Sequence, residues 1–107
     1  MITVDLAENL EFKADNGRLC PIVRCDFCND RIKDGEMSVY LYVFDFDKLE
    51  VIGTVKFAHK GKCHDEIEDQ LRSYHSDDCL VSWNNLNRFF TFLVNNTGIE
   101  LENAKSD

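Results

Sequence analysis

The chain lacks the features that mark membrane, secreted or multidomain proteins. No apolar run approaches the ~20 residues that a helix needs to cross a bilayer. The first residues contain neither the basic cluster nor the apolar segment of a signal peptide. There is one proline, and no internal repeat or low-complexity tract divides the 107 residues. We therefore expect a single cytoplasmic domain over residues 1–107 with no membrane segment.

Basic side chains are also scarce. Twelve Lys and Arg stand against 20 Asp and Glu, which gives a formal net charge of −8. Residues 63–107 carry most of the excess, because three basic residues there stand against nine acidic ones. Proteins hold nucleic acid largely through Lys and Arg at the phosphates, so this balance disfavours a nucleic-acid partner.

The five cysteines are the most informative residues that the chain does contain. An odd number of cysteines without a secretion signal favours a reducing compartment and metal ligation over a disulfide framework. Cys25 and Cys28 form one pair, and His59 and Cys63 follow as a second pair, in the pattern C-x2-C-x30-H-x3-C. Thiolates and an imidazole at this spacing predict a structural, tetrahedral zinc site with these four residues as ligands.

Other cysteines and histidines lie elsewhere in the sequence. His64 follows Cys63 directly, and adjacent residues on a helix point about 100° apart. We therefore prefer His59 to His64 as the ligand, although the sequence leaves His64 open as a replacement. Cys20 and Cys79 have no partner at ligand spacing, and we interpret both as structural thiols.

Hydrophobic patterns predict regular structure between and after the ligands. Alternating β-branched and aromatic residues over 38–46 and 51–58 indicate a β-hairpin with apolar side chains on both faces. Apolar residues at helical spacing predict a helix over 62–75, with acidic residues in its first turns. These elements and the ligands make up a predicted metal-binding core over residues 25–75.

Two further segments are expected to flank that core. Residues 1–24 have the alternation of an extended arm, with a turn at Asp15, Asn16 and Gly17. A C-terminal helix is expected over 82–97, with Ser82 as its N-cap and a stop at its end. The predicted fold class is α+β.

The ligands and their surroundings resemble a known group of zinc fingers. The pair at 25–28 is followed by Gly35, by Tyr40 and then by segment 56–63, Lys-Phe-Ala-His-Lys-Gly-Lys-Cys. This pattern resembles treble-clef fingers of the TRASH and MYM types. It is also similar to a small zinc-binding protein family of the archaeal and eukaryotic large ribosomal subunit. The resemblance covers about residues 25–70 and implies a treble-clef fold holding zinc, with His59 where those families usually have cysteine.

We predict a zinc-stabilised interaction or scaffolding module without catalytic activity, which binds another protein. A four-ligand zinc site leaves no open position for water or substrate, which catalytic zinc requires. One alternative is a nucleic-acid-binding or regulatory zinc finger, in which Tyr40, Tyr42 and Phe44 stack on bases. The TRASH resemblance suggests another alternative, a role in metal sensing or trafficking.

Overall fold

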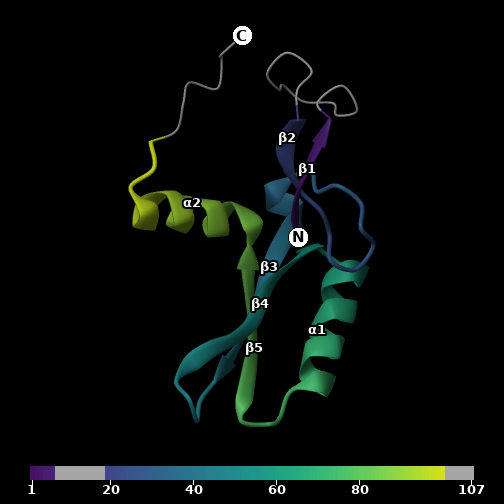
Figure 1. Ribbon diagram of the computed structural model, residues 1–107. Helices are drawn as coiled ribbons and strands as arrows, with labels where there is room; N and C mark the ends of the chain where they lie inside the picture. The colour runs from purple at the N-terminus through teal and green to yellow at the C-terminus, as the bar shows by residue number, and fades with distance from the viewer. Residues whose placement is uncertain (7–18, 101–107) are drawn as a thin grey trace.

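The computed structural model describes residues 1–6 and 19–100, which form two antiparallel sheets and two α-helices (Figure 1). The elements in chain order are β1 (Ile2–Leu6), β2 (Leu19–Val23), the 3-10 turn η3 (Gly35–Met37), β3 (Ser38–Asp45), β4 (Glu50–His59), α1 (Lys62–Tyr74), β5 (Cys79–Asn85) and α2 (Leu86–Thr97). The fold is therefore of the mixed α+β class that the sequence predicts.

The main sheet has β3 as its central strand, in the order β4-β3-β5. Val39, Leu41 and Val43 alternate along β3 and are buried together on one face, as the period of a strand requires. Helix α1 lies along this face (Figure 1) and contributes Ile67 to the same core. The predicted hairpin and the predicted helix after it are confirmed, with small differences at their ends.

The segment before α2 differs from the sequence prediction. A helix over 82–97 with Ser82 as its N-cap is wrong for its first residues, because Ser82 lies within β5 opposite Tyr42 of β3. The pairing gives the backbone of β3 hydrogen-bond partners on both edges and places Val81 in the core. These gains outweigh the local helical pattern.

Helix α2 itself begins at Leu86 and follows β5 without an intervening loop. Asn85, rather than Ser82, is its N-cap residue. Its end agrees with the prediction, because Gly98 adopts the left-handed conformation that commonly terminates helices.

The predicted N-terminal arm is a small sheet in its described part. β1 pairs antiparallel with β2, with Ile2 opposite Val23 and Val4 opposite Pro21. Pro21 is compatible with a strand here because, among the described residues, β2 pairs with a strand on one edge only, and a proline is tolerated where its nitrogen faces the other edge. The turn predicted at Asp15, Asn16 and Gly17 lies outside the described residues.

The two helices lie on different sides of the main sheet. Figure 1 shows α1 running beside the sheet, whereas α2 leaves the end of β5 in another direction. The ring of Phe89 in α2 packs against Tyr40 and Phe57, on the sheet face opposite the buried core. In the described part of the chain, neither helix is long and apolar enough to cross a membrane.

Candidate metal centre

A tight turn directly after β2 positions the first two predicted ligands. The backbone N–H of Cys25 donates to the carbonyl oxygen of Asp30 at 2.9 Å, and that of Asn29 donates to the carbonyl of Cys25 at 3.0 Å. Asn29 has a φ of +67°, in the left-handed region that asparagine tolerates better than most residues. The chain therefore folds back on itself just after Cys28, and both thiols lie on this turn.

The other two predicted ligands lie on either side of the junction between β4 and α1. His59 is the last residue of β4, and Cys63 lies in the first turn of α1. Gly61 makes the bend between them with φ of +91° and ψ of −128°, which side chains rarely allow. The β-hairpin brings this junction back to the turn that carries Cys25 and Cys28.

The structure brings all four predicted ligands together. One ligand atom from each of Cys25, Cys28, His59 and Cys63 lies within 4.8 Å of every other. Cys25 is fully buried and belongs to the hydrophobic core, whereas Cys28 is exposed. Three sulfur atoms and one imidazole nitrogen at such separations can hold a metal ion at their centre.

The imidazole of His59 is oriented by contacts at both of its nitrogens. Nδ1 lies 3.5 Å from Sγ of Cys28, and Nε2 lies 3.4 Å from the backbone carbonyl of Arg31. A carbonyl oxygen only accepts hydrogen bonds, so the proton belongs on Nε2 and the lone pair on Nδ1. The lone pair then points into the cluster, as a metal ligand requires.

Two thiols of the cluster have pKa values that are shifted in opposite directions. Burial by itself would raise the pKa of Cys25, but backbone N–H groups of the turn and of His59 lower that pKa to about 6. One of these donors is the N–H of Phe27, 3.4 Å from Sγ. Burial and the neighbouring Cys25 raise the pKa of Cys63 to about 12. At neutral pH the cluster thus contains a thiolate at Cys25 and a protonated thiol at Cys63, until a cation displaces that proton.

The other residues of ligand type in the described part lie outside the cluster. Nε2 of His64 is 3.1 Å from a carboxylate oxygen of Glu68, and its ring packs edge-on against Trp83 with centroids 4.7 Å apart. Cys79 packs at the edge of the core, with Sγ 3.8 Å from the hydroxyl of Ser76. The side chain of Cys20 lies outside the described residues.

Sequence reasoning missed the role of Asp26, which lies between the first two cysteines. Its carboxylate accepts a hydrogen bond from the backbone N–H of Phe57 at 2.7 Å, and its own N–H donates to the carbonyl of Phe57 at 2.7 Å. Phe57 precedes His59 by two residues on β4. This pair of hydrogen bonds therefore joins the turn to the strand that carries the imidazole. The sequence signal for this role was a carboxylate placed between the two cysteines of the C-x2-C pair.

Comparisons of the chain with protein families, with curated proteins and with solved structures found no match.

Proposed function

We propose that this protein is a zinc-stabilised interaction or scaffolding module of the treble-clef type, intracellular and without catalytic activity. The observation that carries the proposal is the set of four ligand atoms from Cys25, Cys28, His59 and Cys63, all within 4.8 Å of one another. Three soft thiolates and one imidazole form the donor set typical of structural zinc.

Two features favour a structural site over a catalytic one. Four protein ligands complete a tetrahedron, so no position is left for a water or a substrate. The ligands also come from three separate parts of the fold: the turn after β2, the end of β4 and the start of α1. A metal at this point would hold these parts together. The order of turn, hairpin and helix supports the treble-clef assignment.

The interaction role is supported by exposed apolar side chains outside the metal-ligand cluster. Phe92 and Leu93 of α2 and Ile2 and Val4 of β1 are all exposed in the described part. Apolar side chains that gather on a surface commonly mark a binding site for another protein.

The test of the metal centre is the zinc content of the protein purified without added metal, together with the visible spectrum after cobalt substitution. We expect one zinc per chain and the absorption of tetrahedral cobalt with thiolate ligands. The variants Cys28→Ser and His59→Ala should lose both signals, whereas the matched variants Cys79→Ser and His64→Ala should keep them. Equal zinc content in all four variants would contradict the proposed site.

The test of the interaction role is affinity capture from native lysate, with and without prior removal of the metal. A specific protein partner that is lost after metal removal supports the proposal. Recovery of nucleic acid alone would overturn it in favour of the nucleic-acid-binding alternative.

A further inference from the structure

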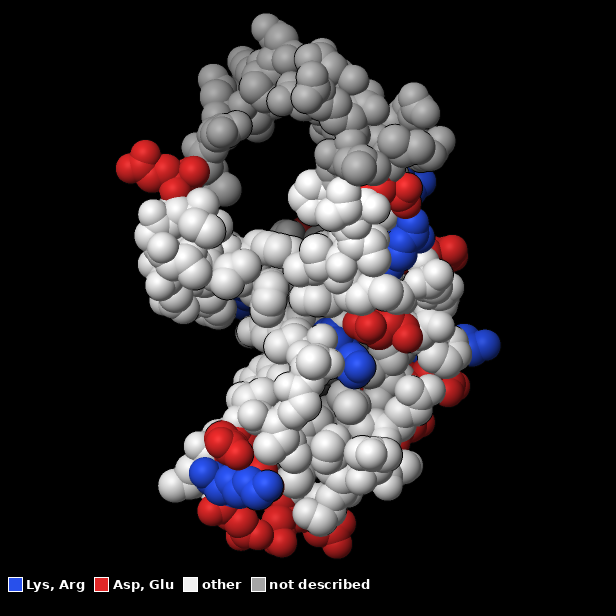
Figure 2. Space-filling view, viewed as in Figure 1, with Lys and Arg blue, Asp and Glu red and all other residues white. Residues whose placement is uncertain are grey.

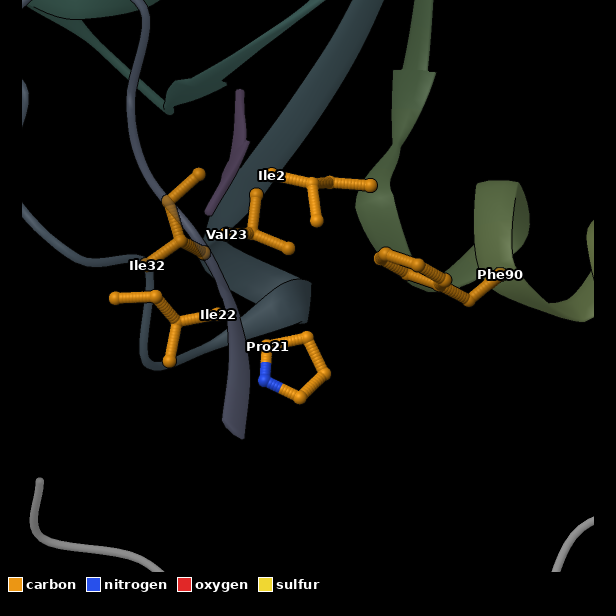
Figure 3. Close-up of a pocket in the computed structure, with 6 residues that line it drawn as sticks. All are labelled: Ile2, Pro21, Ile22, Val23, Ile32 and Phe90. Carbon is orange, nitrogen blue, oxygen red and sulfur yellow. The ribbon is translucent and has the colours of Figure 1, made fainter. Parts of the chain in front are cut away.

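Among the described residues, an apolar pocket and a strand edge can each receive part of another molecule. The pocket lies between α2 and the β1–β2 sheet, where Figure 3 shows Phe90 facing side chains of both strands. Its volume is about 300 Å³, at the lower limit of pockets that hold small ligands, and no polar side chain in its lining fixes an orientation. The pocket therefore indicates no particular partner, whereas the strand edge does.

The strand edge is the outer side of β5 in the main sheet. The register of β5 with β3 runs from Cys79 to Asn85 without a shift, and this segment contains no charged residue, proline or glycine. The opposite edge, β4, carries Glu50 and Lys56, and a bulge around Gly53 interrupts its pairing with β3. Charges, prolines and bulges are the features that usually protect an edge from pairing with another chain. The edge of β5 has none of these three.

The hydrogen-bond pattern shows which backbone groups of β5 face outward. The N–H of Phe46 donates to the carbonyl of Asp78 at 3.2 Å, so the even-numbered residues of β5 bond to β3 and the odd-numbered ones face outward. Asn85 follows this pattern, since its N–H donates to a neighbouring side-chain oxygen at 2.8 Å. The backbone groups of Val81 and Trp83 have no hydrogen-bond partner in the described part. They are free to pair with an added strand.

Apolar side chains flank this edge on both faces of the sheet. Leu80 is 45% exposed on the face away from α1. Trp83 is 50% exposed on the face toward α1, where its ring packs edge-on against His64. A pocket of about 280 Å³ lies between the end of α1 and the start of β5, with Cys79 and Val81 in its lining. The alternating side chains of an added strand thus find apolar contacts on both faces.

The charges around the start of β5 indicate what the added strand carries. Residues 45–50, in the turn between β3 and β4, and residues 77–78 hold five acidic residues and one basic residue. The bond between Phe46 and Asp78 brings these segments together, and Figure 2 shows acidic side chains crowded at this end of the molecule. Asp77 and Asp78 are exposed and form no ion pair in the described part. This end of the edge attracts a basic segment, and the net charge of −8 disfavours a second copy of the chain.

We propose that the outer edge of β5 binds an extended, basic segment of another protein, which joins the main sheet as a further strand. The backbone of this segment pairs with Val81 and Trp83, and its Lys or Arg side chains lie near Asp77 and Asp78. Pairing along the edge requires an extended segment, and the acidic surroundings favour a basic one. The proposal names the class of partner for the proposed interaction role and in that respect rests on the proposed function.

Nuclear magnetic resonance of the zinc-loaded full chain tests the proposal, with a blocked octapeptide of alternating lysine and valine as the probe. In the free protein, the N–H groups of Val81 and Trp83 should exchange with solvent faster than those of Leu80 and Ser82, which bond to β3. Saturating peptide should slow the exchange at Val81 and Trp83 at least about tenfold.

Two control peptides separate strand pairing from charge attraction. One has glutamate in place of lysine, and the other keeps the lysines but has every peptide nitrogen methylated, which removes the donors for strand pairing. Each should bind at least about tenfold more weakly than the probe.

Leu80→Lys and Val51→Lys form a matched pair of variants. Both residues are exposed and lie opposite Phe44, Leu80 on β5 and Val51 on β4, so each variant adds the same charge to the same row of the sheet. Leu80→Lys places its charge at the binding edge and should raise the dissociation constant of the probe at least about tenfold. Val51→Lys should leave it nearly unchanged. Circular dichroism and zinc content, unchanged in both variants, show that they are folded.

Three results would each overturn the proposal: slow exchange at Val81 and Trp83 in the free protein, equal binding of the methylated peptide, or equal weakening by the two variants. A zinc-loaded chain that does not bind the probe refutes strand addition alone and leaves the proposed function standing. A chain that binds the probe but holds no zinc refutes the proposed metal site alone.

Discussion

At the scale of single residues, Asp26 lies between the candidate ligands Cys25 and Cys28 and makes hydrogen bonds to strand β4. Its carboxylate is mostly shielded from solvent, with a side-chain exposure of 17%, and it accepts the N–H of Phe57. Residues that orient metal ligands in this way typically change metal affinity by 10–100-fold when they are replaced. Asp26 therefore belongs to the candidate metal centre although it is not one of the four candidate ligands.

Asp26→Ala should weaken zinc binding by about tenfold or more and lower the free energy of unfolding by about 1–3 kcal/mol. The physical reason is that the N–H of Phe57 loses its acceptor and the turn loses a connection to β4. Zinc affinity is measured by competition with a chromogenic chelator, and stability by urea denaturation. Asp26→Asn is the matched control, because its amide oxygen still accepts this hydrogen bond. An alanine variant with wild-type affinity would refute the role.

The thiols of the metal centre predict how zinc binding depends on pH. The pKa of Cys63 is raised to about 12, so its thiol must lose a proton on binding zinc at pH 7. The pKa of Cys25 is lowered to about 6, so its thiolate is already formed at pH 7 and is lost only as the pH falls through 6. Zinc affinity should therefore rise with pH above 7 and fall more steeply below 6.

Isothermal titration calorimetry in buffers of different ionisation enthalpy counts the released protons. A proton from Cys63 should appear at pH 7, and proton release should increase below pH 6 as Cys25 begins to contribute. Zinc affinity that stays constant from pH 5 to 8 would show that these thiols are not ligands.

The clustering of Cys25, Cys28, His59 and Cys63 was predictable because their spacing is local in sequence. Two short segments carry all four ligands, and the choice of His59 over His64 needed only helix geometry. The contacts of Asp26 were not predictable in the same way. A carboxylate in a turn is usually interpreted as a solvated charge. The partner of Asp26, Phe57, is 31 residues away along the chain.

At the scale of secondary-structure elements, the junction between β4 and α1 depends on the backbone of Gly61. Its φ of +91° and ψ of −128° lie near a region that is open essentially to glycine alone. A Cβ at this position meets nothing within 4 Å, so any cost of substitution is conformational and not steric. This backbone bend sets the position of Cys63 relative to His59.

Gly61→Ala should lower the free energy of unfolding by about 1–3 kcal/mol and also weaken zinc binding, because relief of the strain moves Cys63. Gly53→Ala is the matched control: Gly53 has a φ of +71° and open space around it, but it lies in β4 away from the ligands. Both variants should melt earlier, and only Gly61→Ala should bind zinc more weakly. Equal zinc affinities would show that the bend does not position the ligand.

The elements also show where sequence patterns fail. Aliphatic Val39, Leu41 and Val43 alternate with aromatic residues along β3, and the apolar residues of α1 recur at helical spacing, so each pattern identified its element. The segment around Val81 and Trp83 fits both periods at once, since these two residues alternate as in a strand and also continue the apolar spacing of α2. Pairing with β3 decides between them, and it is a contact between residues about 40 positions apart, which no local pattern contains.

At the scale of the whole molecule, the metal centre joins the two sheets. Cys25 lies two residues after the end of β2, and the backbone N–H of Ile32 donates to the carbonyl of Val23 at 2.8 Å. The β1–β2 sheet is thus attached to the turn that carries two ligands, whereas α2 is attached to the main sheet. The position of the β1–β2 sheet relative to the main sheet therefore depends on this turn.

Removal of the metal should lower the melting temperature by about 10 °C or more, because structural zinc contributes several kcal/mol to folding in small domains. Thermal unfolding followed by circular dichroism, before and after dialysis against a chelator, measures the shift. Restoration by zinc but not by magnesium is the control, since magnesium prefers oxygen ligands. An unchanged melting temperature in protein shown to have lost its zinc would exclude a stabilising role for the metal.

The direct passage of β5 into α2 at Asn85 has a mechanical consequence. With no loop between them, the backbone at Asn85 and the packing of Phe89 on Tyr40 and Phe57 together set the direction of α2. A helix of 12 residues is about 18 Å long, so a difference of roughly 10° in this direction displaces its far end by about 3 Å. The position of the C-terminal end of α2 therefore depends on a few residues at its start.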